Sequence, residues 1–395
     1  MKIGYYIQHF PYKEYLDDRQ YYKQYAYGGA EVAAYNLAVN MAKRGHQVSI
    51  FTTSIDHKDS IEKRENMTIH RYAKNLKVGR SNISFRLFYK PQKYQLDVIH
   101  AHLSVKIDGL AALLHAKRRK IPLIVTHHAD TNVYRGFVHK TRIVYFFSSY
   151  VIKRCFSYAD VIISPSEYYI DESRFLREYR NKIVVIPNGI NVQSFDIPLS
   201  KEECRGRLGL PLDKNIILFV GNLTPYKGPD VLVRAMQKIA QEVPDTELVF
   251  VGSGKMRDEL GKLAEKIGIK NHLKFTGFVE ESMKPLYYKA ADIFVLPSTL
   301  NTEVFPIVLL EASAAGLPMV VSNLNTFKCI IEDGYNGLFT KRGDENSLVD
   351  AIVYLLKNED LRKKMGENAR KKVKNYSWER IAEMIEEVYK SLIKQ

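Results

Sequence analysis

Short apolar runs rich in β-branched residues alternate with longer helical patterns along most of this chain. The helical patterns are clearest at Ala30–Arg44 and Lys106–Arg119. In the first half, the predicted strands are Ile3–Gln8, Gln47–Thr52, Thr68–Tyr72, Val98–Ala101, Leu123–Thr126, Val161–Ser164 and Ile183–Pro187. Alternating strand and helix units are typical of a parallel, doubly wound α/β sheet.

A second series of strand and helix units follows the first. Pro187-Asn188-Gly189 is turn chemistry, and the segment from Pro198 to Pro211 reads as a charged connector that contains glycine. The predicted strands of this series are Ile216–Val220, Glu247–Val251, Leu273–Phe275, Ile293–Leu296, Met319–Val321 and Gly337–Phe339. We therefore predict two Rossmann-like doubly wound domains, at residues 1–195 and 196–375. Such a pair normally binds ligand in a cleft beyond the carboxyl ends of the strands.

Residues 376–395 carry one amphipathic pattern. Ser377 is a favourable N-cap, and apolar residues recur at helical spacing after it. We predict a C-terminal helix that packs back across the N-terminal domain.

Composition argues against several classes of protein. Three cysteines among 395 residues are few, odd in number and far apart, which argues against a disulfide framework or a zinc site and fits a reducing compartment. The chain starts without a secretory pattern, and no uninterrupted apolar run reaches the roughly 18 residues of a membrane span. We expect a cytoplasmic protein that is soluble or bound to a membrane surface.

Positive charge is concentrated in the first half. The formal net charge is +15; residues 1–195 carry 30 Lys and Arg against 16 Asp and Glu, whereas residues 196–395 carry 29 against 28. Such asymmetry suggests a polyanionic partner: nucleic acid, an acidic membrane face or phosphate-bearing substrates. No nucleic-acid recognition motif accompanies the charge.

Two segments are the most basic, residues 74–93 and Lys117–Lys120. The first interleaves Lys77, Arg80, Arg86, Lys90 and Lys93 with Ile83, Phe85, Leu87, Phe88 and Tyr89. Rings in such a segment can enter the headgroup level of a membrane while the cations pair with phosphates. We infer docking on an anionic membrane face or handling of a phosphate-linked lipid acceptor; ordinary surface charge is the alternative.

Two glutamates flank an apolar stretch in the second half. Glu303 and Glu311 are eight positions apart, slightly more than two helical turns, so we predict that both carboxylates face one cleft. Pro306 suits the first turn of that helix. A buried carboxylate needs a partner, and a sugar or ribose hydroxyl is a suitable donor. Two solvated glutamates on a helix face are the alternative.

Glycine-containing loops adjoin several predicted helices. The loop from Gly221 to Asp230 carries Asn222 and Lys227 before a helix start, a pattern for seating a diphosphate. It is not a Walker loop, because no Gly-Lys-Ser/Thr closes it. Gly28-Gly29 precedes a long helix, where a backbone can approach a phosphate closely, and Gly252 opens a Gly-x-Gly turn. A plain turn or a surface lysine is the alternative in each case.

Two histidine pairs, His100 with His102 and His127 with His128, follow predicted parallel strands, where cleft residues belong. Their spacing matches no standard zinc ligand set, so hydrogen bonding to a sugar is the favoured role. The chain also has no Asp-x-Asp, the simplest carboxylate clamp for a metal-bound diphosphate. We expect neither a metal nor a cofactor.

Taken together, these motifs resemble those of the retaining, GT-B-fold glycosyltransferases of the group 1 (family four) class. The resemblance covers nearly the whole chain and is carried by many segments. They are Gly28–Gly29 with the helix ending Lys43–His46, Asp97–His102, Thr126–His128, Ile186–Ile190, Gly221–Gly228, Gly277–Val279, Leu296–Ser298 and Glu303–Gly316. The resemblance implies a cleft between two Rossmann-like domains, with a nucleotide-sugar donor held mainly by the second.

The resemblance also implies roles for single residues. Lys227 matches the lysine that contacts the donor diphosphate, and His128 matches the histidine near the sugar at the reaction centre. Glu303 matches the glutamate that faces the transferred sugar, and Glu311 the one that binds the ribose hydroxyls. Gly28 and Gly29 match the loop that approaches the phosphates and the acceptor.

Further substrate contacts are expected from Gly252, Asn222 and the backbone of Phe305, Pro306 and Ile307. This sequence departs from the family pattern at two places. Asn222 stands where many relatives have arginine, so one cation for the diphosphate is missing or comes from elsewhere. Val304 and Pro306 replace common glycines, which puts the sugar-facing backbone contacts in doubt.

The resemblance thus implies transfer of a hexose from UDP- or GDP-hexose to an acceptor hydroxyl, with retention of configuration. The acceptor would be lipid-linked or a growing cell-surface glycan. Because no carboxylate is obviously placed as a nucleophile, we favour front-face attack assisted by the leaving phosphate, with charge stabilised by Lys227 and helix amides. A nucleotide-sugar epimerase, a sugar phosphorylase and a basic nucleic-acid-binding protein remain as alternatives. A dinucleotide-dependent dehydrogenase is disfavoured, because no Gly-x-Gly-x-x-Gly follows the first strand.

Overall fold

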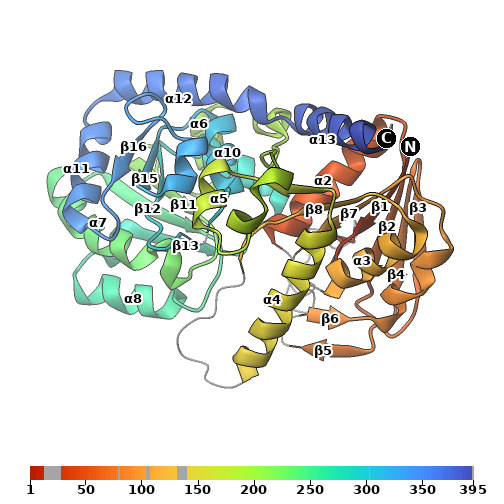
Figure 1. The fold of residues 1–395 in the computed structure, drawn as a ribbon. Coiled ribbons are helices and arrows are strands. Elements are labelled where there is room, and N and C mark those ends of the chain that lie inside the picture. The colour runs from red at the N-terminus through yellow and green to blue at the C-terminus, as the bar shows by residue number, and fades with distance from the viewer. Residues whose placement is uncertain (13–27, 79–80, 104–106, 131–139, 302, 394–395) are drawn as a thin grey trace. The chain divides into compact units, whose positions relative to one another are not determined.

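The computed structural model describes residues 1–12, 28–78, 81–103, 107–130, 140–301 and 303–393 (Figure 1). The chain divides into two α/β units, each with its own sheet. The first comprises Met1–Gly189 and Trp378–Gln395, and the second comprises Ile190–Ser377. The predicted domain boundaries after residues 195 and 375 differ from these, because Ile190 to Phe195 and residues 376–377 associate with the second unit.

The first unit is built on an eight-stranded sheet with the strand order β10-β9-β8-β7-β1-β2-β4-β3. Every neighbouring pair is parallel except the antiparallel β3–β4 pair at one edge. The strands are β1 (Lys2–Tyr6), β2 (Gln47–Thr53), β3 (Ser60–Arg64), β4 (Met67–Tyr72), β7 (Val98–His102), β8 (Leu123–Thr126), β9 (Val161–Ser164) and β10 (Ile183–Val185). A separate hairpin pairs β5 (Leu76–Val78) with β6 (Ser81–Ile83). Each strand predicted for the first half overlaps a strand of this sheet. The edge strand β3 was not predicted, since its Ser-Ile-Glu-Lys-Arg sequence is polar and largely exposed.

Helices cover both faces of this sheet. Because β7, β8 and β9 follow one another in one direction, right-handed crossovers place α3 and α4 on the same face. The β1–β2 crossover runs in the opposite direction and places α2 on the other face, where the C-terminal helix α13 packs against it (Figure 1). The helices are α2 (Gly29–Lys43), α3 (Ile107–Arg119), α4 (Lys140–Tyr158), α5 (Glu167–Glu172) and α13 (Trp378–Ile393).

An ion cluster fastens α13 to the first unit. The Glu386 carboxylate accepts hydrogen bonds from Arg44 and His46, and Lys390 lies 3.0 Å from it. Burial by itself raises the pKa of this carboxyl, but the Arg44, Lys390 and His46 hydrogen bonds outweigh it and lower the pKa to about 2. The apolar face of α13, with Trp378, Ile381, Ala382, Ile385 and Tyr389, joins the core of the first unit.

The second unit contains a six-stranded, fully parallel sheet with the order β13-β12-β11-β14-β15-β16. Its strands are β11 (Asn215–Val220), β12 (Thr246–Val251), β13 (Leu273–Gly277), β14 (Ile293–Leu296), β15 (Met319–Ser322) and β16 (Gly337–Thr340). Its helices are α6 (Lys201–Leu208), α7 (Pro229–Glu242), α8 (Arg257–Lys266), α9 (Lys284–Ala290), α10 (Ile307–Ala315), α11 (Glu345–Leu356) and α12 (Glu359–Val373). All six predicted strands are present, and their apolar runs fill the core of this unit.

The prediction of a connector between Pro198 and Pro211 was wrong, because helix α6 occupies it. A capping box starts the helix: the Glu203 amide donates to the Ser200 hydroxyl, and the Ser200 amide donates to the Glu203 carboxylate. Gly209, at φ 59°, ends it. Arg205 then anchors α6 through its hydrogen bond to Asp292, 2.7 Å long. The Ser-x-x-Glu spacing was the sequence signal for this helix.

Within the described residues, no helix combines the length and the apolar character that crossing a membrane requires.

Candidate active site

The Gly221–Gly228 loop leaves the carboxyl end of β11 and leads into α7. Gly221 and Gly228 have φ angles of 145° and 65°, which L side chains rarely adopt. Pro225–Lys227 form a 3-10 turn, with the Lys227 amide donating to the Thr224 carbonyl at 3.1 Å. A Cβ atom at Gly221 would lie 3.4 Å from the Lys227 side chain. The loop therefore folds Lys227 back over its own first glycine.

Lys227 and Glu303 form an ion pair in which each side chain is only 10% exposed. The Ser298 hydroxyl donates to the second oxygen of the Glu303 carboxylate, and the Thr326 hydroxyl donates to the Glu303 backbone carbonyl at 2.7 Å. Burial by itself lowers the pKa of Lys227, but attraction to Glu303 outweighs it, so the pKa of the ammonium lies above its usual value. Lys227 is therefore a fixed, protonated cation.

This pair lies at the switch point of the second sheet. From β11 the chain moves outward to β12 and β13 and then returns to β14 on the other side of β11. Lys227 follows β11, whereas Ser298 and Glu303 follow β14. Doubly wound sheets bind ligands beyond the carboxyl ends of the two strands where the order reverses. Ser298 belongs to the Leu-Pro-Ser motif, but sequence reasoning assigned it no role.

Glu303 and Glu311 do not share a helix, so the spacing argument for them was wrong. Helix α10 starts at Ile307 with Pro306 as its N-cap, and Glu303 lies in the loop before it. Phe305 is buried in the core and its ring packs on Tyr376, 5.8 Å between centroids. Any contact of Phe305 with a ligand is therefore left to its backbone.

Glu311 lies inside α10 and is 7% exposed. Its Oε2 atom accepts a 2.6 Å hydrogen bond from the Tyr288 hydroxyl, and its Oε1 atom lies 3.6 Å from Lys284 Nζ. Burial raises the pKa of Tyr288 well above its usual value, and the Glu311 charge raises it further, so the phenol keeps its proton and donates. The protein itself supplies the donor that the sequence argument sought in a sugar. No sequence signal identified Tyr288.

Gly252 closes the carboxyl end of β12 against the Gly221 loop. A Cβ atom on Gly252, whose φ is 133°, would lie 2.1 Å from the Gly221 carbonyl oxygen. The Leu223 amide donates to the Ser253 carbonyl at 3.0 Å, so the two loops are joined backbone to backbone. Asn222, which lies between Gly221 and Leu223 in the first of these loops, is exposed. Gly252 thus shapes the loop that carries Lys227.

Gly28 and Gly29 begin α2 in the first unit and are exposed. The Gly28 amide donates to the Glu31 carboxylate at 3.0 Å, and the Val32 amide donates to the Gly28 carbonyl at 3.1 Å. An anion that approached the Gly28 amide would therefore meet the Glu31 carboxylate. The structure shows this glycine as a helix cap.

Three of the four histidines gather at the carboxyl ends of β7 and β8. His102 Nδ1 lies 3.2 Å from His128 Nε2, and the rings of His100 and His102 stack with centroids 4.4 Å apart. His127 instead pairs with Asp130, 2.8 Å from Nε2 to Oδ1. Among the described residues, no cluster of three or more His, Cys, Asp or Glu side chains could hold a metal ion.

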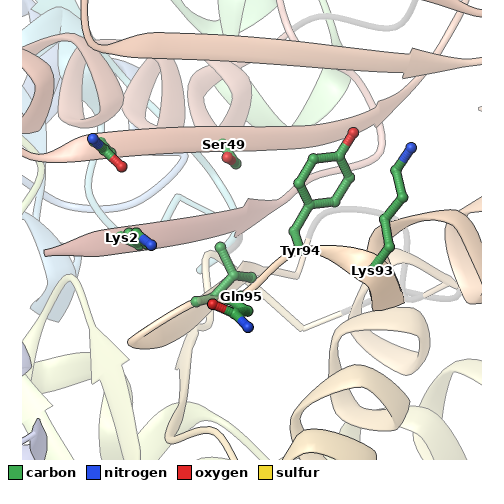
Figure 2. A pocket seen from close by; sticks show the side chains of 7 residues that line it. Lys2, Ser49, Lys93, Tyr94 and Gln95 are labelled. Atoms are coloured by element: carbon green, nitrogen blue, oxygen red, sulfur yellow. The ribbon is translucent and has the colours of Figure 1, made fainter.

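A separate hollow of about 340 Å³ lies at the other end of the first sheet (Figure 2). Its lining includes Lys2 and Gln47, the first residues of β1 and β2, together with Lys93 and Tyr94. The Lys93 ammonium lies 5.2 Å from the centre of the Tyr94 ring. Because it opens at the amino ends of the strands, this hollow lies at the opposite end of the sheet from the histidine cluster.

Two family models match this chain. The model described as glycosyl transferases group 1 matches residues 200–372, and the model described as glycosyltransferase family 4 matches residues 27–194. These regions contain the Lys227–Glu303 pair and the histidine cluster, respectively. The chain belongs to the group 1 glycosyltransferases, enzymes that transfer sugars to acceptors.

Relatives agree with this family, and solved structures share the fold. An uncharacterized glycosyltransferase of Methanocaldococcus jannaschii is 41% identical over 214 residues, which cover 53% of this chain and 54% of that protein. The alpha-monoglucosyldiacylglycerol synthase of Acholeplasma laidlawii is 27% identical over 386 residues, 92% of this chain and 94% of that protein. The structure of Anabaena Alr3699/HepE in complex with UDP has a TM-score of 0.76 at 19% identity and covers 99% of this chain and 100% of its own; it was also solved with UDP-glucose. The fold is therefore GT-B.

Proposed function

We propose that this protein transfers a hexose from a nucleotide diphosphate sugar to an acceptor hydroxyl, with retention of the anomeric configuration. The observation that carries the proposal is the Lys227–Glu303 ion pair, braced by Ser298 at the switch point of the second sheet. The second unit would hold the donor and the first unit the acceptor. A UDP-sugar is the first donor to test, because the Anabaena protein was solved with UDP-glucose.

In the proposed reaction, the bond between the sugar and the diphosphate breaks through an oxocarbenium-like transition state. The acceptor oxygen attacks from the same face, and its proton passes to the leaving phosphate oxygen. Negative charge grows on the diphosphate, where a protonated Lys227 and the amides at the start of α10 would stabilise it. Because Glu303 already holds Lys227 in place, the cation needs little reorganisation when the donor binds.

A panel of UDP-, GDP- and ADP-sugars tests the proposal, with thermal shift for binding and product analysis for the reaction. We expect one sugar donor to raise the melting temperature and to give an α-linked product from an α-linked donor. An inverted product, an epimerised donor or phosphorolysis would refute the proposed reaction.

Glu311→Ala should weaken donor binding about tenfold or more, because a charged hydrogen-bond acceptor is lost from the proposed ribose site. Tyr288→Phe is the matched control for structural damage around Glu311.

Turnover is expected to persist in excess EDTA. The reason is that the sequence offers no Asp-x-Asp clamp, while Lys227 is placed to supply positive charge. Initial rates before and after chelation, with Mg²⁺ and Mn²⁺ added back, measure this. Loss of activity with EDTA and its recovery with one divalent ion would contradict the metal-free proposal.

We also propose that the first unit docks on an anionic membrane face of the cytoplasmic compartment. Among the described residues of the basic segment 74–93, only some are available for membrane contact. Arg86 pairs with Asp59 at 2.5 Å, and Lys90 pairs with the same carboxylate, so the charge of both cations is partly neutralised. Arg80 lies outside the described residues. Ile83 and Leu87 are buried in the protein, whereas the rings of Phe85 and Tyr89 are 52% and 58% exposed.

Helix α4 supplies a second group of exposed rings. Phe146, Phe147 and Tyr150 are 69%, 43% and 55% exposed, and the Arg154 guanidinium lies 5.2 Å from the Tyr150 ring. The whole helix contains no acidic residue. Helix α3, which packs between α4 and the 3-10 turn Phe85–Phe88, adds the exposed run Lys117–Lys120. Exposed rings beside cations fit an anionic membrane surface.

Replacing Phe146 and Tyr150 with serine should lower vesicle binding about tenfold or more, since two inserted rings are lost. Co-sedimentation with phosphatidylglycerol-containing vesicles measures binding, and added salt should reduce it. Tyr354→Ser is the control, because Tyr354 is 53% exposed on α11 of the second unit. Equal sedimentation with neutral and anionic vesicles would contradict the docking proposal.

A further inference from the structure

Two hydrogen-bonded pairs of side chains connect β7 with the end of β8. His100 Nε2 lies 2.7 Å from Thr126 Oγ1, and His102 Nδ1 lies 3.2 Å from His128 Nε2. Residues two apart on a strand share a face, so His100 and His102 point to the same side of the sheet. The second pair includes His128, the histidine that the family resemblance implies lies near the transferred sugar.

The first pair, His100 with Thr126, is held in place by the C-terminal helix α13. Tyr389 is fully buried, and its hydroxyl oxygen lies 2.7 Å from His100 Nδ1. The Tyr5 hydroxyl lies 2.8 Å from the same Tyr389 oxygen. Both ring nitrogens of His100 therefore have hydrogen-bond partners. The orientation of this ring is fixed, and the ring of His102 stacks on it.

His102 stacks on His100 and meets the edge of the nearly coplanar ring of His128. Its centroid lies 4.4 Å from that of His100 and 5.5 Å from that of His128, with interplanar angles of 24° and 18°. It is 2% exposed, and its Nε2 atom has no hydrogen-bond partner among the described residues. Burial, together with the neighbouring His100 and His128, lowers the pKa of His102 well below its usual value, so the ring is neutral.

A neutral imidazole carries one N–H, and the surroundings of His102 decide which nitrogen has it. A proton on Nε2 would leave a buried donor without an acceptor among the described residues, and such donors are rare and costly in proteins. A proton on Nδ1 is hydrogen-bonded to His128 and leaves only a bare lone pair at Nε2. His102 therefore donates, and His128 Nε2 accepts.

We propose that His102 is a positioning residue that fixes the ring of His128 and holds it as the tautomer protonated on Nδ1. His128 then keeps an N–H on the nitrogen opposite the bond to His102. The inference rests on the proposed function only for the role of His128 in turnover; the tautomer itself is a property of the first unit.

Nitrogen–proton correlation spectra of the unliganded, ¹⁵N-histidine-labelled protein test the tautomer directly. We expect the His128 signals of a ring protonated on Nδ1 in the wild type, and a mixture of tautomers in His102→Leu. His128→Asn assigns the signals. A wild-type His128 protonated on Nε2, or an unchanged spectrum in His102→Leu, would overturn the proposal.

Kinetics test the consequence. His102→Leu should lower kcat about tenfold to a hundredfold, as expected for a misplaced catalytic group, with the donor KM within about twofold of wild type. His102→Asn can place an amide N–H near the original Nδ1 position and should recover most of kcat. His115→Leu is the control for loss of a buried histidine, since His115 bonds the Tyr6 hydroxyl elsewhere in this unit.

Equal losses of kcat in His102→Leu and His102→Asn would argue against the hydrogen bond and overturn the positioning role. Wild-type turnover by His128→Ala would instead overturn the role of His128 in the proposed function. The spectra separate these two failures, because they report the His102–His128 bond without any substrate.

Discussion

Lys227→Ala is expected to lower kcat about a hundredfold or more, because one charge contact to the transition state is typically worth a few kcal/mol. The loss should appear in kcat more than in the donor KM, since charge on the diphosphate grows as the bond to the sugar breaks. Initial rates over a range of donor concentrations separate the two parameters. Lys270→Ala is the control, because Lys270 forms an exposed ion pair with Glu265 on the surface.

The Lys227–Glu303 pair makes the double variant informative. In Lys227→Ala, the Glu303 carboxylate keeps the Ser298 hydroxyl but loses its cation, so the melting temperature should also fall. Glu303→Gln should reduce turnover similarly, and Lys227→Ala with Glu303→Gln should cost less than the sum of the single changes. Additive losses, or wild-type kinetics in either single variant, would contradict a shared role in the reaction.

Gly252→Ala is expected to destabilise the second unit by about 2–5 kcal/mol and to reduce turnover. Its φ of 133° disfavours any side chain, and a Cβ atom would lie 2.1 Å from the Gly221 carbonyl oxygen. The backbone of the Gly221 loop would have to shift, and this loop carries Lys227. Thermal unfolding should show a melting temperature lower by roughly 5–15 °C, given the size of the unit.

Gly206→Ala is the matched control for this substitution. Gly206 lies within α6, and no atom lies within 4 Å of the position that its Cβ would take. Alanine there should be neutral or stabilising by about 0.5–1 kcal/mol, because glycine is unfavourable inside a helix. If Gly252→Ala had the same melting temperature as Gly206→Ala and kept full activity, the close approach of the two loops would contribute nothing to stability, and the prediction would be wrong.

Charge and protonation at the candidate site depend on partners that are far apart in sequence. Lys227 meets Glu303 only because β11 and β14 are neighbours in the second sheet. Glu311 meets Tyr288 because α9 packs on α10. Likewise Asp59 forms ion pairs with both Arg86 and Lys90, which the sequence showed only as part of a basic segment. Composition counts charges, whereas the tertiary structure determines which of them remain unpaired.

The sequence by itself determined the architecture and the positions of the key motifs. Short β-branched runs are typical of central strands buried on both faces of a parallel sheet, and their alternation with helical patterns predicted both α/β units. Glycines at 221, 228 and 252 marked loops whose backbone no other residue adopts easily. These are local properties, and each is readable from a few neighbouring residues.

Only the tertiary structure decided the partners. Glu303 and Glu311 fit one helix by spacing, but Glu303 precedes the helix because α10 begins after Pro306. Tyr389 reaches His100 across 289 positions of sequence, and sequence spacing contains no information about such a contact. Hydrogen bonds and ion pairs depend on distances of a few ångströms, which are set by how strands and helices pack and not by the order of residues along the chain.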